Sequence, residues 1–375
     1  MSKKKDSAEA ISASSRSPSP VSGASKVKEE EASEEEVEGE VEGEVEEESE
    51  ESSEEEVEED KPAMLSDVPG IGPGTVAKLE AAGVYDLMGL AVMSPPALSE
   101  MAGMGEAVAR KAIQAARSMM DLGFVSGDEF ARRRKDVAYI TTGSQELNNL
   151  LGGKGVETKA MTEAYGAFGS GKTQLGLTLA VNVQLPKDQG GAEAKAVFID
   201  TEGTFRPERI RQIAEGIGAN PETALKNILV ARAFNSDHQI LLIDKIGELV
   251  KNGENIKLLV VDSLTAHFRA EFAGRGQLAD RQQKLNRYLH SLMRMAEQYN
   301  LAVFVTNQVM SNPAMMFGDP TTAIGGNIVG HASTYRIYLR RGKQGSRVAK
   351  MIDSPNLPEN ECVFFLTEHG IRDET

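Results

Sequence analysis

The segment at residues 166–173, which reads GAFGSGKT, carries the clearest chemical signature of the sequence. It fits the pattern G-x-x-x-x-G-K-[ST] at every constrained position. Glycines in such a segment let backbone N–H groups turn inward around phosphates, and the start of the next helix adds a positive dipole. The pattern predicts a phosphate-binding loop formed by Gly166, Ala167, Phe168, Gly169, Ser170, Gly171, Lys172 and Thr173.

Two side chains of this loop have predicted roles of their own. Lys172 should bridge the β- and γ-phosphates of a nucleotide, and Thr173 should bind Mg²⁺. The alternative is a glycine-rich turn with a chance lysine. An apolar segment at 160–165 and a helical pattern after the loop argue against that alternative.

Polar residues follow three later apolar runs, which lie at 196–200, 257–261 and 302–305. In an open parallel sheet the ligand lies beyond the carboxyl ends of the strands, so these polar groups should converge on the same phosphates. We expect Asp262 to hold Mg²⁺ and Glu202 to orient an attacking water as a base. Gln308 is the expected sensor of the γ-phosphate. A purely structural role at a strand end stays open for Glu202 and Gln308.

The elements that must position these residues begin at about Val137. From there apolar strand runs alternate with helices, which predicts βαβ units and a mostly parallel sheet. The chain finishes with short strands at 334–340, 347–352 and 362–367, which should be antiparallel. We therefore expect an α/β fold in which residues 137–375 form a P-loop ATPase core.

A small all-α unit is predicted at residues 61–122, ahead of a linker at 123–136. Its segment PGIGPG, followed by a helical pattern, is typical of a helix-hairpin-helix turn, in which Gly70 and Gly72 would expose backbone N–H groups to a DNA phosphate. The alternative is a plain turn between helices. A second glycine turn at 103–105 is a weaker copy of the first.

The first 60 residues differ from the rest in charge. They contain 6 basic and 23 acidic residues, a net charge of −17, whereas the whole chain carries −16. Dense like charge with low hydrophobicity cannot offset the entropy cost of ordering, so we expect a disordered acidic tail. The remaining residues are nearly neutral, and the low pI therefore says nothing about what the folded part binds.

Two core segments are predicted to be long loops on the phosphate side of the sheet. The first, 269–280, carries Arg269 and Arg275; the second, 309–324, starts with Val309 and Met310 and leads into Gly325 and Gly326. A basic loop beside an apolar one could bind a single DNA strand, with arginine on phosphate and apolar groups between bases. Two flexible crossover loops are the alternative.

Several classes of protein are excluded. A single cysteine, Cys362, rules out a disulfide framework and suits a reducing compartment. No apolar run of about 20 residues could span a membrane, and the lysine-rich start lacks the apolar segment of a secretory signal. The five histidines show no metal-binding spacing, and His331 by itself is typical of a core histidine. We expect a cytoplasmic protein.

The chain from about residue 61 onward resembles the archaeal RadA recombinases of the RecA-like strand-exchange ATPase family. The resemblance rests on stretches such as VPGIGPGTVAKL, YGAFGSGKTQ, FIDTEGTFRPERI, LLVVDSLTAHFRAEFAGRGQLADRQQ and IGGNIVGHASTYRIYLRRG. It covers about 310 of the 375 residues and leaves out the acidic tail. It implies a RecA-like core, ATP and Mg²⁺ as cofactors, and both single-stranded and double-stranded DNA as partners.

The resemblance also implies roles for individual residues. Glu202 would be the catalytic glutamate, Arg209 would stack on adenine, and Gln308 and His331 would couple the γ-phosphate to the two DNA-binding loops. Asp353 and Pro355 belong to a stretch that caps the nucleotide of a neighbouring protomer. Phe124 matches the anchor of a polymerisation strand that inserts into the next protomer, although Gly127 stands where many members have alanine.

These features predict a DNA-dependent ATPase that forms helical filaments on single-stranded DNA and catalyses homologous pairing and strand exchange in DNA repair. A ring without DNA is a further expected state of the homo-oligomer, and the expected location is the archaeal cytosol, at the nucleoid. A hexameric helicase is an alternative that would not need an anchor such as Phe124. A non-enzymatic mediator paralogue is disfavoured because both loops and Glu202 are present.

Overall fold

The computed structural model describes residues 64–374, except 82–83, 85, 121–124, 273 and 312–320. The predicted acidic tail and the predicted anchor Phe124 lie outside the described residues. Among the helices that the structure describes, none is long and apolar enough to cross a membrane.

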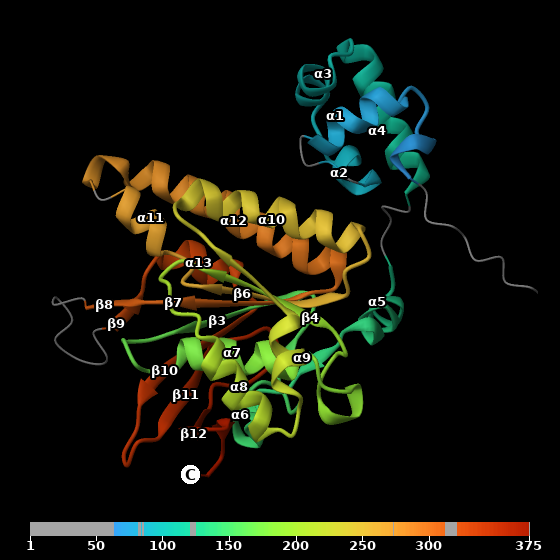
Figure 1. Cartoon of the computed structure of the whole chain (residues 1–375). Coiled ribbons are helices and arrows are strands. Elements are labelled where there is room, and N and C mark those ends of the chain that lie inside the picture. The colour runs from blue at the N-terminus through green and yellow to red at the C-terminus, as the bar shows by residue number, and fades with distance from the viewer. Residues whose placement is uncertain are drawn as a thin grey trace, which may run out of the picture. The chain divides into compact units, whose positions relative to one another are not determined.

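The first described part is a small helical unit with a core of its own (Figure 1). Its elements are η1 (Leu65–Asp67), α1 (Pro73–Ala81), α2 (Leu87–Ala91), α3 (Pro95–Ala102) and α4 (Glu106–Met119). Small polar residues start these short helices: the Asp86 carboxylate accepts from Gly89 N at 2.6 Å, and the Ser94 hydroxyl accepts from Ala97 N at 3.4 Å. Such caps satisfy N–H groups that have no partner within the helix. The predicted all-α unit is confirmed.

Most of the segment predicted as a linker is helical. It contains α5 (Gly127–Arg133) and η2 (Arg134–Asp136). Ser126 caps α5 by accepting from Glu129 N at 3.1 Å. Acidic residues in the first turn and arginines in the last turn complement the helix dipole, which explains why this charged run is helical. A polymerisation strand can therefore lie only before residue 127.

A nine-stranded sheet forms the centre of the remaining chain, in the order β13-β12-β11-β10-β3-β7-β6-β4-β5. The six strands from β10 to β5 are parallel, and β10 to β13 pair antiparallel, as the sequence predicts. The strands of this sheet are β3 (Ala160–Tyr165), β4 (Lys195–Asp200), β5 (Ile228–Arg232), β6 (Ile256–Asp262), β7 (Ala302–Asn307), β10 (Tyr335–Arg341), β11 (Arg347–Asp353), β12 (Glu361–Thr367) and β13 (Gly370–Arg372). Two separate pairs are β1 (Tyr139–Ile140) with β2 (Val156–Glu157), and β8 (Val309–Ser311) with β9 (Thr321–Ala323).

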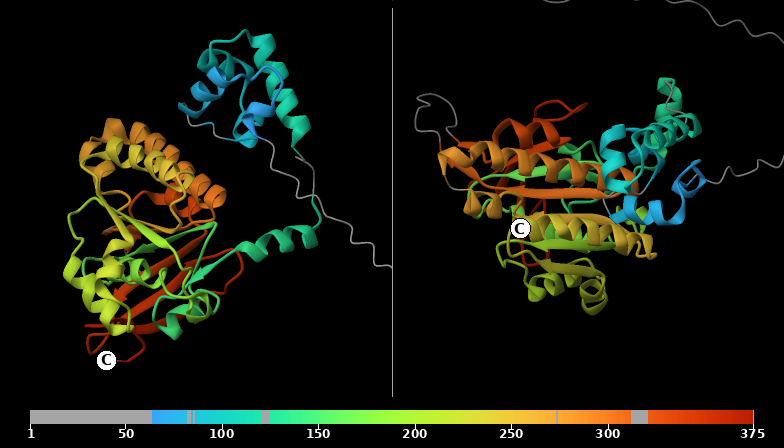
Figure 2. Two further views of the ribbon diagram at one scale, coloured as in Figure 1. Left: turned by 45° about the vertical axis from the view of Figure 1, so that its right-hand side comes forward. Right: turned by 90° about the horizontal axis from the view of Figure 1, so that it is seen from above.

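Helices cover both faces of the sheet, as Figures 1 and 2 show. One face carries α6 (Gln145–Leu150), α7 (Lys172–Asn182), η3 (Lys187–Gln189), α8 (Pro207–Gly216) and α9 (Pro221–Lys226). The other face carries α10 (Ser236–Lys251), α11 (Ala266–Glu271), η4 (Arg275–Gln277), α12 (Leu278–Tyr299) and α13 (Gly326–Ala332).

Alternate residues of the central strands enter the two separate cores. On β6, Leu258 and Val260 pack into the core with α7, whereas Leu259 and Val261 pack into the core with α10 and α12. Successive side chains of a strand point to opposite faces, so a strand buried on both faces must be apolar throughout. This explains why the runs before Asp200, Asp262 and Gln308 are continuous in the sequence.

Candidate active site

The predicted phosphate loop lies between β3 and α7. Gly166 leaves β3 with its N–H donating to Asn307 O at 3.3 Å, and the loop closes at Gly171, the residue before α7. A Cβ on Gly166 would lie 2.1 Å from Leu339 O, and Gly169 has φ +74°. No side chain larger than glycine's hydrogen fits at the first position, and the second favours glycine because of its backbone angle.

A cavity of about 640 Å³ opens beside this loop. Its lining combines the phosphate loop with the polar ends of β4, β6 and β7, which confirms that parallel strands bring these residues together. The lining residues are Gly166, Ala167, Phe168, Gly169, Gly171, Lys172, Thr173, Gln174, Glu202, Thr204, Asp262, Ser263, Thr306, Gln308, Val309, Arg347 and Leu366.

Asp262 is the buried acidic group of this cavity. Its Oδ2 accepts from Thr173 Oγ1 at 2.8 Å and from Thr204 Oγ1 at 3.2 Å, and its Oδ1 accepts from the Thr306 hydroxyl. The carboxylate therefore lies directly beside the hydroxyl that the loop pattern assigns to Mg²⁺. Carboxylate and hydroxyl oxygens are ligands that suit Mg²⁺. Thr204 adds a further hydroxyl that the motif did not single out.

Glu202 and Gln308 are in direct contact. Gln308 Nε2 donates to Glu202 Oε1 at 2.8 Å, and Gln308 Oε1 faces Arg269 Nη1 at 3.4 Å. Glu202 follows β4, Gln308 follows β7 and Arg269 lies in α11, so the contact depends on the tertiary fold. It joins the predicted base, the predicted sensor and a predicted DNA-binding arginine in one chain of hydrogen bonds.

Asp200 holds the turn that carries Glu202, a role that the sequence did not reveal. Its Oδ1 accepts from the N–H groups of Glu202, Gly203 and Thr204 at 3.1, 2.6 and 3.1 Å, and its Oδ2 accepts from Phe205 N at 3.2 Å. A carboxylate that accepts several N–H groups fixes the local backbone firmly. The only signal in the sequence was an acid at the end of an apolar run, which resembles Asp262.

Lys172 lies across its own loop. Its ammonium group donates to Gly166 O at 2.8 Å and to Ala167 O at 3.0 Å. Burial lowers the pKa of Lys172, and the nearby carboxylates of Asp262 and Glu202 oppose that shift. An ammonium in partly buried surroundings gains most from an anionic partner.

The residues of the loop fit a nucleotide and its metal. The buried Ser170 hydroxyl has no hydrogen-bond partner among the described residues, and the glycines leave a cradle that a Cβ would fill. At this place in the loop the Ser170 hydroxyl can donate to a phosphate oxygen. By contrast, Phe168 is 95% exposed, so only its backbone is suited to phosphate.

Three residues that the resemblance assigns to nucleotide binding lie outside the cavity lining given above. Arg209, on α8, donates to Gln174 Oε1 at 2.7 Å and to Thr367 O at 2.7 Å, and Gln174 in turn lines the cavity. Asp353 ends β11, and Pro355 follows it. The role of Asp353 and Pro355 as a cap on a neighbour's nucleotide stays a prediction.

The two predicted DNA-binding loops are shorter than expected. Arg269 lies in helix α11, and Arg275 begins η4, so regular structure covers most of the first segment. In the second segment Val309 and Met310 belong to β8, which pairs with β9. The sequence did not predict these strands because backbone pairing does not require alternating apolar residues. The prediction that 309–324 is a long loop is therefore wrong at both ends. Residues 312–320 lie outside the described chain.

The glycine pair after the second segment is placed at the start of a helix. Gly325 (φ +96°) precedes α13 and Gly326 (φ +59°) begins it, and a Cβ on Gly325 would lie 2.5 Å from Val329 Cγ2. His331 is exposed in the last turn of this helix, so the interpretation as a core histidine is wrong.

The helix-hairpin-helix turn has the backbone that its sequence predicts. Gly70 has φ +88°, a conformation that favours glycine, and Gly72 precedes α1. No hydrogen bond within the described chain takes its donor from the N–H of Gly70 or Gly72. Both donors are therefore available to an anion such as a phosphate.

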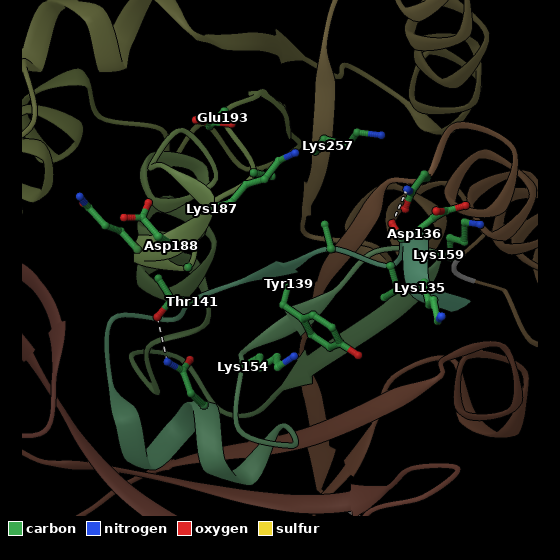
Figure 3. A pocket seen from close by; sticks show the side chains of 18 of the residues that line it. Lys135, Asp136, Tyr139, Thr141, Lys154, Lys159, Lys187, Asp188, Glu193 and Lys257 are labelled. Carbon is green, nitrogen blue, oxygen red and sulfur yellow. Dashed lines mark hydrogen bonds between the residues drawn. The ribbon is translucent and has the colours of Figure 1, made fainter. Parts of the chain in front are cut away.

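A larger cavity, of about 1140 Å³, lies elsewhere on the core (Figure 3). Its lining includes Lys159, just before β3, and Lys257, at the start of β6, so it lies at the amino ends of the parallel strands. Burial lowers the pKa of Lys257, and the charges of Lys159 and Lys187 lower it further. In open parallel sheets, ligands bind at the carboxyl ends of the strands, which is the opposite edge. This cavity is therefore not the active site, although its volume is larger.

Comparison with known proteins decides the family. The sequence profile of the Rad51 family matches residues 133–374. This chain belongs to the Rad51 family. A second profile, the SAM-like helix-hairpin-helix tandem, matches residues 63–118 and includes both glycine turns.

A curated relative agrees with this membership. The protein described as "DNA repair and recombination protein RadA" from Aeropyrum pernix is 51% identical over 309 residues, which cover 82% of this chain and 96% of the relative. The predicted resemblance is thus confirmed, together with the α/β fold and its preceding helix-hairpin-helix unit. As a member of the Rad51 family the chain is a DNA-dependent ATPase of DNA repair and recombination.

Proposed function

We propose that this chain binds ATP and Mg²⁺ beside the phosphate loop, forms a helical filament on single-stranded DNA, and exchanges strands with a homologous duplex. The observation that carries the proposal is the chain of contacts from Glu202 through Gln308 to Arg269. These hydrogen bonds connect the ATPase site to Arg269, a residue of the predicted DNA-binding loop. An enzyme that hydrolyses nucleotides without binding DNA would not need this connection.

The geometry of the cavity supports the following catalytic roles. The backbone N–H groups of the loop and Lys172 bind the phosphates, and Thr173 with Asp262 holds the metal, which when bound neutralises developing charge on the phosphate oxygens. Glu202 orients the attacking water and accepts its proton at Oε1 or Oε2. Gln308 reports the state of the γ-phosphate, because it is hydrogen-bonded to Glu202.

The DNA roles are divided between two parts of the chain. Residues 61–122 act as a DNA-binding helix-hairpin-helix domain, in which Gly70 and Gly72 offer N–H groups to phosphate. In the ATPase core, 137–375, Arg269 and Arg275 bind phosphates, and Val309, Met310, Gly325 and Gly326 belong to the second DNA-binding segment. His331 couples that segment to Gln308.

Assembly uses residues that do not serve the chain's own cavity. Phe124, in the linker 123–136, anchors one protomer in the next, and Asp353 and Pro355 lie over the neighbour's nucleotide. Arg209 stacks on the adenine of the bound nucleotide. The filament forms on DNA, and a ring is the expected form without it. The protein acts in the archaeal cytosol at the nucleoid, and residues 1–60 are its acidic tail.

Electron microscopy with single-stranded DNA and ATP tests this function. We expect a continuous helical filament. A closed six-membered ring around DNA would indicate a helicase, and the absence of self-assembly would indicate a mediator that does not exchange strands; either result would contradict the proposal.

A further inference from the structure

We infer that Asn307 is a positioning residue that couples the phosphate loop and Gln308 to both DNA-facing segments, and that Thr265 is its link to the first of them. The inference deepens the proposed function, since it rests on Gln308 acting as the sensor. Asn307 is the last residue of β7 and is fully buried. It does not line the nucleotide cavity as described above, so its side chain acts through other residues.

Every hydrogen-bonding group of the Asn307 side chain is used. Its Oδ1 accepts from Thr265 Oγ1 at 2.8 Å and from Gln308 N at 2.9 Å. Its Nδ2 donates to Glu163 Oε1 at 2.8 Å and to Ile324 O at 2.6 Å. A side-chain amide has two acceptor sites and two donors, so this group is saturated and its orientation is fixed.

Three of the four partners belong to the parts that must communicate. Thr265 is the residue before α11, the helix that carries Arg269. Ile324 follows β9 at the end of the second segment, and its own N–H donates to Gln308 O at 2.9 Å. Gln308 contacts Glu202. A shift at one of these parts therefore strains the bonds that Asn307 makes to the others.

The backbone of Asn307 adds the phosphate loop to this set. Its carbonyl accepts from the N–H of Gly166, the first residue of the loop, at 3.3 Å. The parallel register places Tyr165 beside Asn307, which brings the end of β3 and the end of β7 together. Asn307 thus contacts the start of the phosphate loop, the sensor, the end of the second DNA-binding segment, and the residue before the helix that carries Arg269.

A buried ion pair keeps the Asn307 amide in place. Glu163 is fully buried; its Oε1 accepts from Asn307, and its Oε2 accepts from Arg336 Nε at 2.7 Å. The Arg336 guanidinium also lies over the Tyr165 ring at 5.3 Å, and a Cβ on Gly330, beside His331, would lie 2.9 Å from its Nη1. Buried charges that are paired and hydrogen-bonded are costly to disturb, so this pair favours one arrangement of the network.

Thr265 offers the cleanest test, because replacing Asn307 itself would leave several buried groups without partners. Thr265→Val keeps the shape of the side chain and removes only the hydroxyl that donates to Asn307. Thr265→Ser keeps the hydroxyl. Thr162→Val is the matched control: Thr162 is a fully buried threonine on β3 whose hydroxyl has no partner among the described residues.

The measurement is the rate of ATP hydrolysis by the full chain, with and without saturating oligo(dT), together with binding of a fluorescent ATP analogue. For Thr265→Val we expect nucleotide binding and DNA-independent hydrolysis within twofold of wild type. Stimulation by DNA should fall by roughly fivefold or more, the lower range of typical coupling between sites. Thr265→Ser and Thr162→Val should keep full stimulation.

Undiminished stimulation in Thr265→Val would overturn the inference and leave the proposed function standing. Loss of stimulation in Thr265→Ser as well would also overturn it, because the shared hydroxyl would then not be the coupling group. A wild-type chain without any stimulation by DNA would overturn the proposed function itself, and the inference with it.

Discussion

Glu202 shows how a catalytic side chain depends on neighbours that do no chemistry. Asp200 binds the N–H groups of the turn on which Glu202 lies, and Gln308 Nε2 donates to the Glu202 carboxylate at 2.8 Å. The carboxylate is therefore held from its backbone and from its tip. Preorganised groups of this kind do not have to be arranged anew for each reaction.

Replacing Glu202 by glutamine should stop turnover without preventing nucleotide binding. The variant Glu202→Gln keeps the size of the side chain but loses the base, and such bases typically contribute roughly 10²–10⁴-fold to the rate. The measurement is DNA-stimulated phosphate release, with Glu208→Gln on the exposed start of α8 as the control. A rate within twofold of wild type would disprove the assignment of the base.

Replacing Lys172 should have a different effect. Lys172→Ala removes the ammonium group whose partly buried position favours an anionic partner, so nucleotide binding itself should be lost. Titration with a fluorescent ATP analogue measures this loss directly. Unchanged affinity would show that the backbone of the loop is sufficient for binding.

The sequence predicted the chemical groups of the site better than the network that holds them. The phosphate loop could be predicted because all of its residues lie close together in the sequence. Asp262 could be predicted because it follows an uninterrupted apolar strand. Asn307 gave no such signal, because its role depends on the register of β3 against β7 and on the folding of α11 beside them. Those relations join residues more than 40 positions apart.

At the scale of elements, the end of the chain stabilises an early helix of the core. Asp373 Oδ2 accepts from Gln145 N at 2.8 Å, and its Oδ1 accepts from Ser144 Oγ at 2.5 Å, at the start of α6. An acid at this end of a helix satisfies N–H groups and complements the dipole. No pattern in the sequence predicts this pairing, although the antiparallel strands that lead to it were predicted.

Removing this cap should destabilise the core. Asp373→Ala should cost about 1 kcal/mol, which lowers Tm by roughly 2–4 °C for a domain of this size. Thermal denaturation followed by circular dichroism measures the change, and Asp244→Ala, an exposed position in the middle of α10, serves as the control. An equal Tm for the Asp373 variant and the wild type would mean that other groups satisfy the start of α6.

At the scale of the whole molecule, we propose that a second chain completes the nucleotide site of the first. Asp353 and Pro355 lie outside the lining of the described cavity, and Phe124 precedes a helix that begins at Gly127. If Phe124 is the anchor between protomers, Phe124→Ala should remove about 2–4 kcal/mol of interface energy. Light scattering without DNA should then report monomers that still bind ATP. A variant that still forms rings or polymers would place the anchor elsewhere.

The acidic tail can affect the whole chain, because its negative charge can interact with any basic surface that the tail reaches. Residues 1–60 carry a net charge of −17, whereas the rest of the chain is close to neutral. A tethered polyanion competes with DNA at a high effective concentration, and salt screens that competition. A chain that starts at Lys61 should therefore bind duplex DNA more tightly than the full chain at low salt, and the difference should shrink as salt rises. If the tail serves only solubility or a basic partner, the two affinities will be equal throughout a salt titration followed by fluorescence anisotropy.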